Sequence, residues 1–340
     1  MSIRIPFARE LGLALVTFLL LSALSAASAS AETVQAKLRV LTPDRVLDPG
    51  TTYVVGKEEV TTDPAADCTF GGAGGSGATY EFPEPVALGL LQAASRATAS
   101  LRPVSVTDEF GFGLAICAIG GVDDHEGAFW YLKKNHRELT VGADQEPIAN
   151  GDELLIYLAP DNFPAPNPAE LELVSPPRVE QGSQFSVSVL EHACVTDPNP
   201  PYETSCETRP ASGVTVTGAG QSVTTGPDGT ATLVATEAKR IALSATRGSD
   251  IPSGTLRTCV AEQLEDCPAV RGERIVGTGK GDRIRSTRGA DSIRARGGDD
   301  RIDIRRGAKD KVDCGGGEDE VLVRHRDRDD RIAKDCERIR

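Results

Sequence analysis

The sequence predicts a mainly β protein with an α+β N-terminal domain, a β-sandwich and a C-terminal parallel β-roll, and three observations lead to this prediction. Between residues 32 and 160, strand-like apolar runs surround one helical segment. Residues 171–267 alternate valine, threonine and serine around a Gly-Pro-Asp-Gly turn, as the short strands of a sandwich do. From residue 271 to 340, aspartate and a branched apolar residue recur about every nine residues, which is typical of a parallel β-roll.

Residues 1–31 are expected to be a signal peptide. Arg4 and Arg9 form a basic start, Leu11 to Leu24 is an apolar run, and Ala29-Ser30-Ala31 is a small-residue cleavage site. The apolar run is shorter than the ~20 residues that cross a bilayer, and an uncleaved membrane anchor is the alternative. We therefore expect a secreted, extracellular protein with no membrane span after signal cleavage.

Eight cysteines follow this segment, and an even number in an exported chain indicates disulfide bonds. The sequence does not determine how they pair. Pairing neighbours keeps each bridge inside one module, so this is the economical choice. The expected pairs are Cys68–Cys117, Cys194–Cys206, Cys259–Cys267 and Cys314–Cys336. No spacing of cysteine and histidine suggests a zinc site.

Charge is distributed unevenly along the chain. Residues 271–340 contain 20 lysines and arginines against 16 aspartates and glutamates, whereas the whole chain has a net charge of −13. The body of the protein is therefore acidic and the C-terminal part is basic. An acidic body argues against nucleic acid as a partner.

The second half of the N-terminal domain, residues 32–160, contains a series of six short motifs. They are Ile119-Gly120, Trp130-Tyr131, Asn135, Gly142-Ala143, Gly151-Asp152 and Tyr157. This order resembles the β-grasp-like domain of unknown function found at the C-terminus of transcobalamin and in many secreted bacterial proteins. The sequence departs from the pattern at His136, where that family often has glycine.

The resemblance to the transcobalamin domain implies a role in ligand binding, but the cobalamin binding of transcobalamin is not readily transferred to this chain. In transcobalamin this domain helps to bind cobalamin, but the other cobalamin-holding domain is absent here. Trp130 and Tyr131 are candidates for stacking on a ligand. The alternative is that one of them is a core residue, because neighbours in a strand point to opposite faces.

A proline-rich linker is expected at residues 161–170, because each proline removes an N–H donor and stiffens the chain. The β-sandwich predicted for residues 171–267 contains "SGVTVTG" and "TTGPDGTATL". These segments resemble the bacterial immunoglobulin-like modules that serve as stalks in surface proteins.

The C-terminal repeat covers residues 271–340. Its spacing resembles the hemolysin-type calcium-binding repeat of secreted bacterial proteins. That resemblance implies calcium as a cofactor, because carboxylates and backbone carbonyls of successive turns can surround a hard cation. The candidate calcium ligands are Asp282, Asp291, Asp300, Asp310 and Asp319.

Arginine stands beside the apolar residue of several repeats, at positions 283, 285, 294 and 301. These side chains are expected to point outward and to pair with aspartates of neighbouring turns, which would reduce the repulsion that calcium relieves. Two further hypotheses therefore stay open. The roll is indifferent to calcium, or its basic face binds an acidic cell-wall polymer.

The sequence contains little that indicates catalysis. No serine-hydrolase, zinc-protease or phosphate-loop motif occurs, and the four histidines are scattered over the modules at positions 125, 136, 192 and 325. The segment "VDDHE" at residues 122–126 gathers carboxylates and a histidine, but a solvated loop explains it more simply. We therefore expect that the protein is not an enzyme.

These observations and resemblances together indicate a secreted, modular, non-enzymatic bacterial protein with a binding or adhesion role at the cell surface or outside the cell. Its partner is an unknown cell-surface or extracellular ligand. The alternative is an extracellular carrier of a small, cobalamin-like ligand through the N-terminal domain. A deep aromatic pocket near Trp130 favours the carrier, whereas flat exposed sheets favour adhesion.

Overall fold

The computed structural model describes residues 33–68, 74–111, 113–124, 127–161, 163–307, 309–324 and 329–340. The expected signal peptide lies outside these ranges. Residues 31–340 form one compact unit. The prediction of a mainly β fold is confirmed, with α1 (Ala87–Ala97) as the α-helix of the described part. Below, residues 33–160 are called the head, residues 170–267 the sandwich and residues 271–340 the roll.

The head is built around five strands that lie next to one another in the order β2-β1-β10-β8-β9. Their bounds are β2 Val46–Val55, β1 Val34–Leu41, β10 Glu153–Pro160, β8 Ala128–Lys134 and β9 Arg137–Glu138. Helix α1 has its apolar side, including Leu88, Leu90 and Leu91, fully buried in the head core. Burial of this stripe against the sheet is what holds an 11-residue helix in place.

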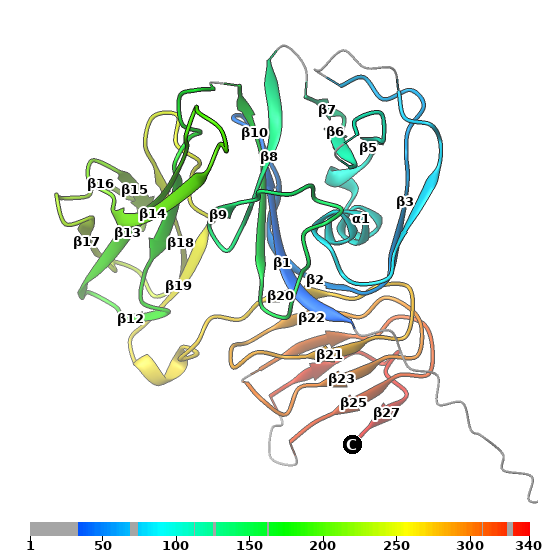
Figure 1. Ribbon diagram of the computed structural model, residues 1–340. Helices are drawn as coiled ribbons and strands as arrows, with labels where there is room; N and C mark the ends of the chain where they lie inside the picture. Colours follow the sequence, from blue (N-terminus) through cyan, green and yellow to red (C-terminus); the bar gives the residue numbers. More distant parts are fainter. Residues whose placement is uncertain are drawn as a thin grey trace, which may run out of the picture. The chain divides into compact units, whose positions relative to one another are not determined.

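Two smaller sheets complete the head. One pairs β3 (Glu58–Thr61) with β4 (Thr79–Phe82), and the other contains β5 (Val104–Thr107), β6 (Ala115–Ile119) and β7 (Val122–Asp123). A short 3₁₀ turn, η1 (Ala99–Leu101), connects α1 to β5. Figure 1 shows these strands beside α1.

The sandwich consists of two facing sheets. The first contains β11 Glu170–Val174, β13 Gln184–Thr196, β14 Thr204–Pro210 and β17 Thr230–Val234. The second contains β12 Arg178–Glu180, β19 Leu256–Ala261, β18 Arg240–Thr246, β15 Thr215–Gly218 and β16 Gln221–Thr224, with the turn η2 Leu264–Asp266 after β19. Val189, Leu233 and Leu243 are fully buried between the sheets, as the alternating sequence pattern requires.

The roll stacks short parallel strands into two sheets. One contains β20 Arg274–Val276, β22 Ser292–Arg294, β24 Lys311–Asp313 and β26 Arg331–Ile332. The other contains β21 Arg283–Arg285, β23 Arg301–Asp303, β25 Glu320–Leu322 and β27 Arg338–Ile339. Ile275 pairs with Ile293, and Ile284 pairs with Ile302, so two repeats make one coil. Figure 1 shows the resulting layers in orange and red.

The first coil of the roll continues the sheet of the head. Strand β20 pairs in parallel with β2, and Thr52 stands opposite Ile275. The second roll sheet begins beside Gln35, whose side-chain amide donates to the carbonyl of Arg285 at 3.1 Å and accepts its N–H at 2.8 Å. The head therefore covers edges that would otherwise leave backbone groups unpaired.

The four disulfides of the structure are the four expected pairs. They are Cys68–Cys117, Cys194–Cys206, Cys259–Cys267 and Cys314–Cys336. The last one ties β24 to the chain after β26 and is part of the roll core. Among the described residues, no helix has the length and apolar character needed to cross a bilayer.

Candidate functional site

A pocket lies at the edge of strand β8, where the head meets the linker and strands β13 and β14 of the sandwich. Its volume is about 480 Å³, within the ~300–1,000 Å³ of typical small-molecule sites. Most of its wall is apolar or aromatic, with contributions from Phe110, Trp130, Tyr131, Leu139, Val141 and Phe163. A pocket with an aromatic wall therefore lies at Trp130.

The short strand β9 explains why the pocket forms. It pairs with β8 only at Lys133 and Lys134, so the first half of β8 is paired with β10 on one side and has no strand of the sheet on the other. Trp130 and Tyr131 are neighbours in β8 and point to opposite faces, yet both line the pocket. The pocket therefore runs around this open edge.

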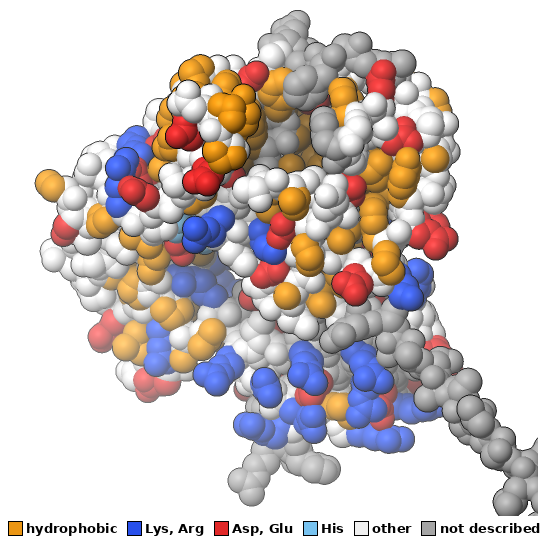
Figure 2. Space-filling model, in the orientation of Figure 1, with side chains coloured by type: hydrophobic (Ala, Val, Ile, Leu, Met, Phe, Trp, Pro, Cys, Tyr) orange, Lys and Arg blue, Asp and Glu red, His pale blue; other side chains and the backbone are white. Residues whose placement is uncertain are grey.

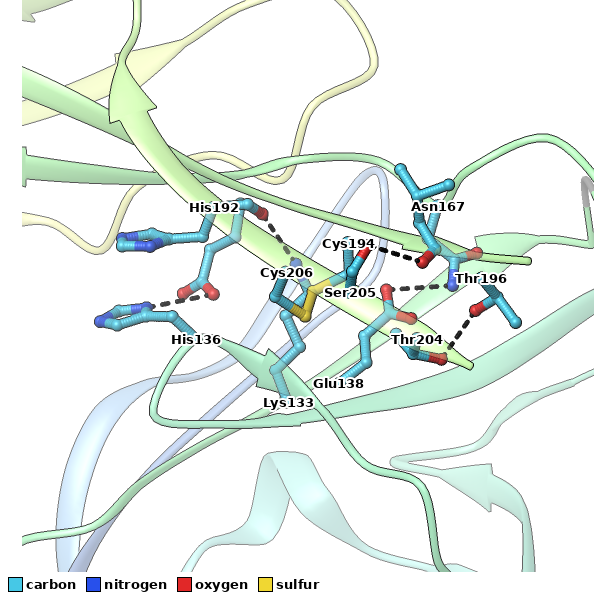
Figure 3. The surroundings of a disulfide bond; sticks show 12 residues. Lys133, His136, Glu138, Asn167, His192, Cys194, Thr196, Thr204, Ser205 and Cys206 are labelled. Atoms are coloured by element: carbon cyan, nitrogen blue, oxygen red, sulfur yellow. Dashed lines mark hydrogen bonds and ion pairs between the residues drawn. A yellow bond between two sulfur atoms is a disulfide. The ribbon is translucent and has the colours of Figure 1, made fainter. Parts of the chain in front are cut away.

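The polar wall of the pocket comes from strand β9, the linker and the sandwich. Asn167 donates to the carboxylate of Glu138 at 3.2 Å, and the hydroxyl groups of Thr196 and Thr204 lie 2.9 Å apart. Figure 3 shows these two pairs beside the Cys194–Cys206 disulfide, which fixes the hairpin of β13 and β14. The pocket thus offers a few polar groups against an aromatic wall.

Trp130 belongs both to the head core and to the pocket. Only 7% of its surface is exposed, and its indole Nε1 has no hydrogen-bond partner. A buried N–H without an acceptor costs about 1–3 kcal/mol. Tyr131 is partly buried and stacks on Tyr157, with ring centroids 5.7 Å apart. Burial, together with the charges of Asp161 and Glu138, raises the pKa of Tyr131 to about 12.

The five candidate calcium ligands form two buried columns along the roll. Asp282, Asp291, Asp300, Asp310 and Asp319 are each at most 3% exposed. In one column the N–H of Asp282 donates to Asp300 Oδ1 at 2.7 Å, and the N–H of Asp300 donates to Asp319 Oδ1 at 2.9 Å. In the other, the N–H of Asp291 donates to Asp310 Oδ1 at 2.8 Å. The carboxylates of Asp300, Asp310 and Asp319 thus each connect two coils.

The second carboxylate oxygen is the one that would bind a cation. Oδ2 of Asp300 and of Asp319 is buried and has no hydrogen-bond partner. Burial, then repulsion from Asp282 and Asp319, raises the pKa of Asp300 to about 7. Burial and the neighbouring aspartates likewise raise the pKa of Asp310 to about 6. No three of the described aspartates bring carboxylate oxygens within 4.8 Å of one another, so calcium bound here would need backbone carbonyls and water to complete its oxygen ligands.

No arginine in the described part of the roll forms an ion pair with a candidate calcium ligand. Arg301 pairs with Glu320 at 2.6 Å and Arg294 with Asp313 at 3.6 Å, both on the outer faces. The expected pairing with aspartates of neighbouring turns therefore occurs for Arg294, but with Asp313 and not with a candidate calcium ligand. Figure 2 shows lysine and arginine side chains gathered over the roll.

A buried ionic network joins the head to the sandwich, and the sequence patterns did not indicate it. Arg39 Nη2 contacts Glu170 Oε1 at 3.0 Å, and His136 Nδ1 lies 3.2 Å from Glu170 Oε2. The Lys133 ammonium is completely buried and donates to the carbonyl of His192 at 3.0 Å. Burial favours a raised pKa for Glu170, but His136 and Arg39 outweigh it and hold that pKa below its usual range.

Two of the scattered histidines meet at this network. The rings of His136 and His192 stack in parallel with centroids 3.9 Å apart, as Figure 3 shows. His192 Nε2 lies 2.9 Å from Glu172 Oε2, and His136 Nε2 lies 3.9 Å from the same oxygen. The hydrogen bond to Glu170 raises the pKa of His136, whereas burial and the charge of His136 lower the pKa of His192.

The other acidic and histidine candidates do not form a site that can be described. In the "VDDHE" segment, Val122, Asp123 and Asp124 are described, but residues 125 and 126 lie outside the described ranges. Residue 325, the fourth histidine, also lies outside them.

Two solved structures show a weak likeness to this chain. No protein-family model matches the chain, and no curated protein matches it. A crystal structure of haptocorrin in complex with Cbi matches 40% of this chain and 28% of its own length, at 16% identity and a TM-score of 0.27. A putative metal binding protein from Ruminococcus gnavus matches 37% of this chain and 97% of its own length, at 17% identity and a TM-score of 0.23. Likenesses of this size support no functional argument.

Proposed function

We propose that the protein is an exported, non-enzymatic binding protein whose head and sandwich hold a small, largely apolar ligand in the pocket at Trp130. The observation that carries this proposal is the concave pocket with its aromatic wall. The flat apolar part of a ligand would lie against this wall, and the few polar groups of the lining would orient it.

Export is supported by the four disulfides, because such bonds persist in oxidising compartments. The carrier hypothesis is preferred here to adhesion because the pocket is concave and aromatic, which a flat adhesive sheet does not need. The pocket geometry indicates the size and apolar character of the ligand but not its chemical class. Corrinoids are therefore one ligand class to test among others.

A second proposal concerns the roll, which we expect to take calcium as a structural ion. Asp300 and Asp319 carry it, because each has one buried oxygen with no hydrogen-bond partner. When bound, calcium would neutralise the mutual repulsion within the column. The residues themselves already hold the coils together through their Oδ1 hydrogen bonds.

Trp130 is the only tryptophan of the chain, so its fluorescence reports directly on the pocket. We expect small aromatic compounds in a screen that includes corrinoids to shift or quench this emission with saturable affinity. Val141 is 46% exposed and lines the pocket. Val141→Glu should weaken binding by about tenfold or more, equivalent to ~1.4 kcal/mol, because it places a charge against an apolar ligand.

Val174→Glu is the matched control for this experiment. Val174 is 44% exposed, lies on β11 and does not line the pocket, so its replacement should leave affinity unchanged. Equal affinities for the two variants would show that the compounds bind elsewhere. If no small compound shifts the emission while the protein binds cell-surface glycans, the adhesion hypothesis is the better one.

A further inference from the structure

We infer that His136, His192 and Glu172 form a binding site for a zinc-class transition metal at the joint between the head and the sandwich. His136 stands in the turn between β8 and β9, Glu172 lies on β11 and His192 lies on β13. One potential ligand atom from each residue can be chosen so that all three lie within 4.8 Å of one another. An ion at this point would connect the two parts of the chain directly.

The spacing of the ligand atoms suits zinc once the two imidazole rings rotate out of their parallel stack, because the nitrogen lone pairs of parallel rings do not point at one ion. Zinc bonds of about 2.0–2.2 Å in a tetrahedral arrangement place ligand atoms roughly 3.3–3.6 Å apart. Glu172 Oε2 lies 2.9 Å from His192 Nε2 and 3.9 Å from His136 Nε2, on either side of this value. Two imidazole nitrogens and one carboxylate oxygen are a donor set that zinc accepts and that calcium does not prefer.

The second ring nitrogen of His192 has a hydrogen-bond partner, which is independent support for a metal site: His192 Nδ1 lies 2.8 Å from Thr208 Oγ1. His136 Nδ1 lies 3.2 Å from Glu170 Oε2, close to this carboxylate but without hydrogen-bond geometry. Histidines that bind metals usually donate their other N–H to a carboxylate or another oxygen, which orients the ring and fixes its tautomer. Here that arrangement directs His192 Nε2 toward Glu172.

The backbone at His136 gives a further reason to assign a role to its side chain. Asn135 and His136 have φ values of 50° and 67°, so both residues of this two-residue hairpin turn are left-handed. Glycine is the favoured second residue of such a turn, and another residue there is strained. The imidazole that is retained at this position is the one that reaches Glu170 and Glu172.

The cluster is open to solvent through a groove whose lining contains six lysine and arginine side chains and four glutamates. The side chains of His136 and Glu172 are 28% and 38% exposed and lie in the wall of a groove. The carboxylates of Glu170 and Glu172 balance the nearby charges of Arg39 and Lys133. Because only three protein ligands converge, water or an anionic group would complete the coordination.

The proposal is tested with the full mature chain, stripped of metal and then titrated with Zn²⁺ by calorimetry in excess calcium, which occupies oxygen-only sites. We expect one equivalent of Zn²⁺ to bind and to raise the melting temperature. Co²⁺ in place of Zn²⁺ should give the visible absorption of a site with nitrogen ligands. His136→Asn and His192→Gln should each lower Zn²⁺ affinity by at least about tenfold.

Two features keep this test decisive. Asparagine tolerates a left-handed backbone, so His136→Asn removes the ligand without breaking the turn. Glu180→Gln, an exposed carboxylate at the end of β12, should leave Zn²⁺ affinity unchanged. Zn²⁺ binding that is absent, or that is equally tight in both histidine variants, would overturn the proposal. Ligand binding at Trp130 is measured separately and does not depend on this outcome.

Discussion

Replacing Glu170 with alanine is expected to lower the free energy of unfolding by about 3–5 kcal/mol, the usual cost of breaking a buried ion pair from one side. Glu170 is 1% exposed and is the counter-charge of Arg39, which is itself 6% exposed. Its removal would leave Arg39 buried without its carboxylate partner, next to the fully buried ammonium of Lys133. Chemical denaturation followed by far-ultraviolet circular dichroism measures the change.

Glu153→Ala is the control for this prediction. Glu153 also pairs with a cation, Lys37, at 3.0 Å, but both side chains are partly exposed. Exposed pairs contribute about 0–1 kcal/mol, so this variant should be close to the unmodified protein. Similar losses for the two variants would contradict the view that the buried pair at Glu170 is what locks the head against the sandwich.

The regular parts of the fold could be predicted because their signals are periodic. The nine-residue spacing places Ile284, Ile293 and Ile302 in a buried column, and the structure has them there. The pairing of β20 with β2 could not be predicted in this way. Strand β20 is three residues long, and its partner lies more than 200 residues earlier, so only tertiary packing selects that partner.

The candidate site residues likewise differ in whether a local sequence pattern indicates them. Trp130 was a candidate because an aromatic pair in an alternating strand is a local feature. His136 and His192 are 56 residues apart in different modules, and nothing local relates them. Their meeting depends on how β8 and β13 approach each other, which a sequence pattern does not contain. The only local hint is His136 itself, a bulky residue at a turn position where glycine would be relaxed.

Without calcium, the stability of the roll is expected to fall as pH rises from about 4 to about 7. The pKa of Asp300 is raised to about 7 and that of Asp310 to about 6, from an ordinary value of 3.8. Within this window the folded state binds more protons than the unfolded state, so raising the pH favours unfolding. Below pH 4 both states are protonated, and above pH 7 the cost of the buried charges is fully present.

Asp300→Asn should remove much of this pH dependence. Asparagine keeps an acceptor for the N–H of Asp282 but carries no charge, so the variant should be more stable than the unmodified protein at pH 8 without calcium. The control is Asp303→Asn. Asp303 pairs with Arg305 at 2.7 Å on the outer face, and its pKa is lowered by that hydrogen bond. This variant should keep the fall in stability between pH 4 and pH 7.

Calcium should reverse the effect of high pH in the unmodified protein. At pH 8 millimolar calcium should protect the amides of β21 and β23 in hydrogen-exchange mass spectrometry, with a gain that grows as free calcium exceeds its dissociation constant. At pH 5 the gain should be small, because protons compete for the same buried oxygens. Asp300→Asn should lose most of the gain at pH 8, whereas Asp303→Asn should keep it. Protection that is independent of calcium at pH 8 would contradict calcium binding and favour a roll held together by its Oδ1 hydrogen bonds alone. A stability of the roll that rises from pH 4 to pH 7 would contradict the raised pKa values of Asp300 and Asp310.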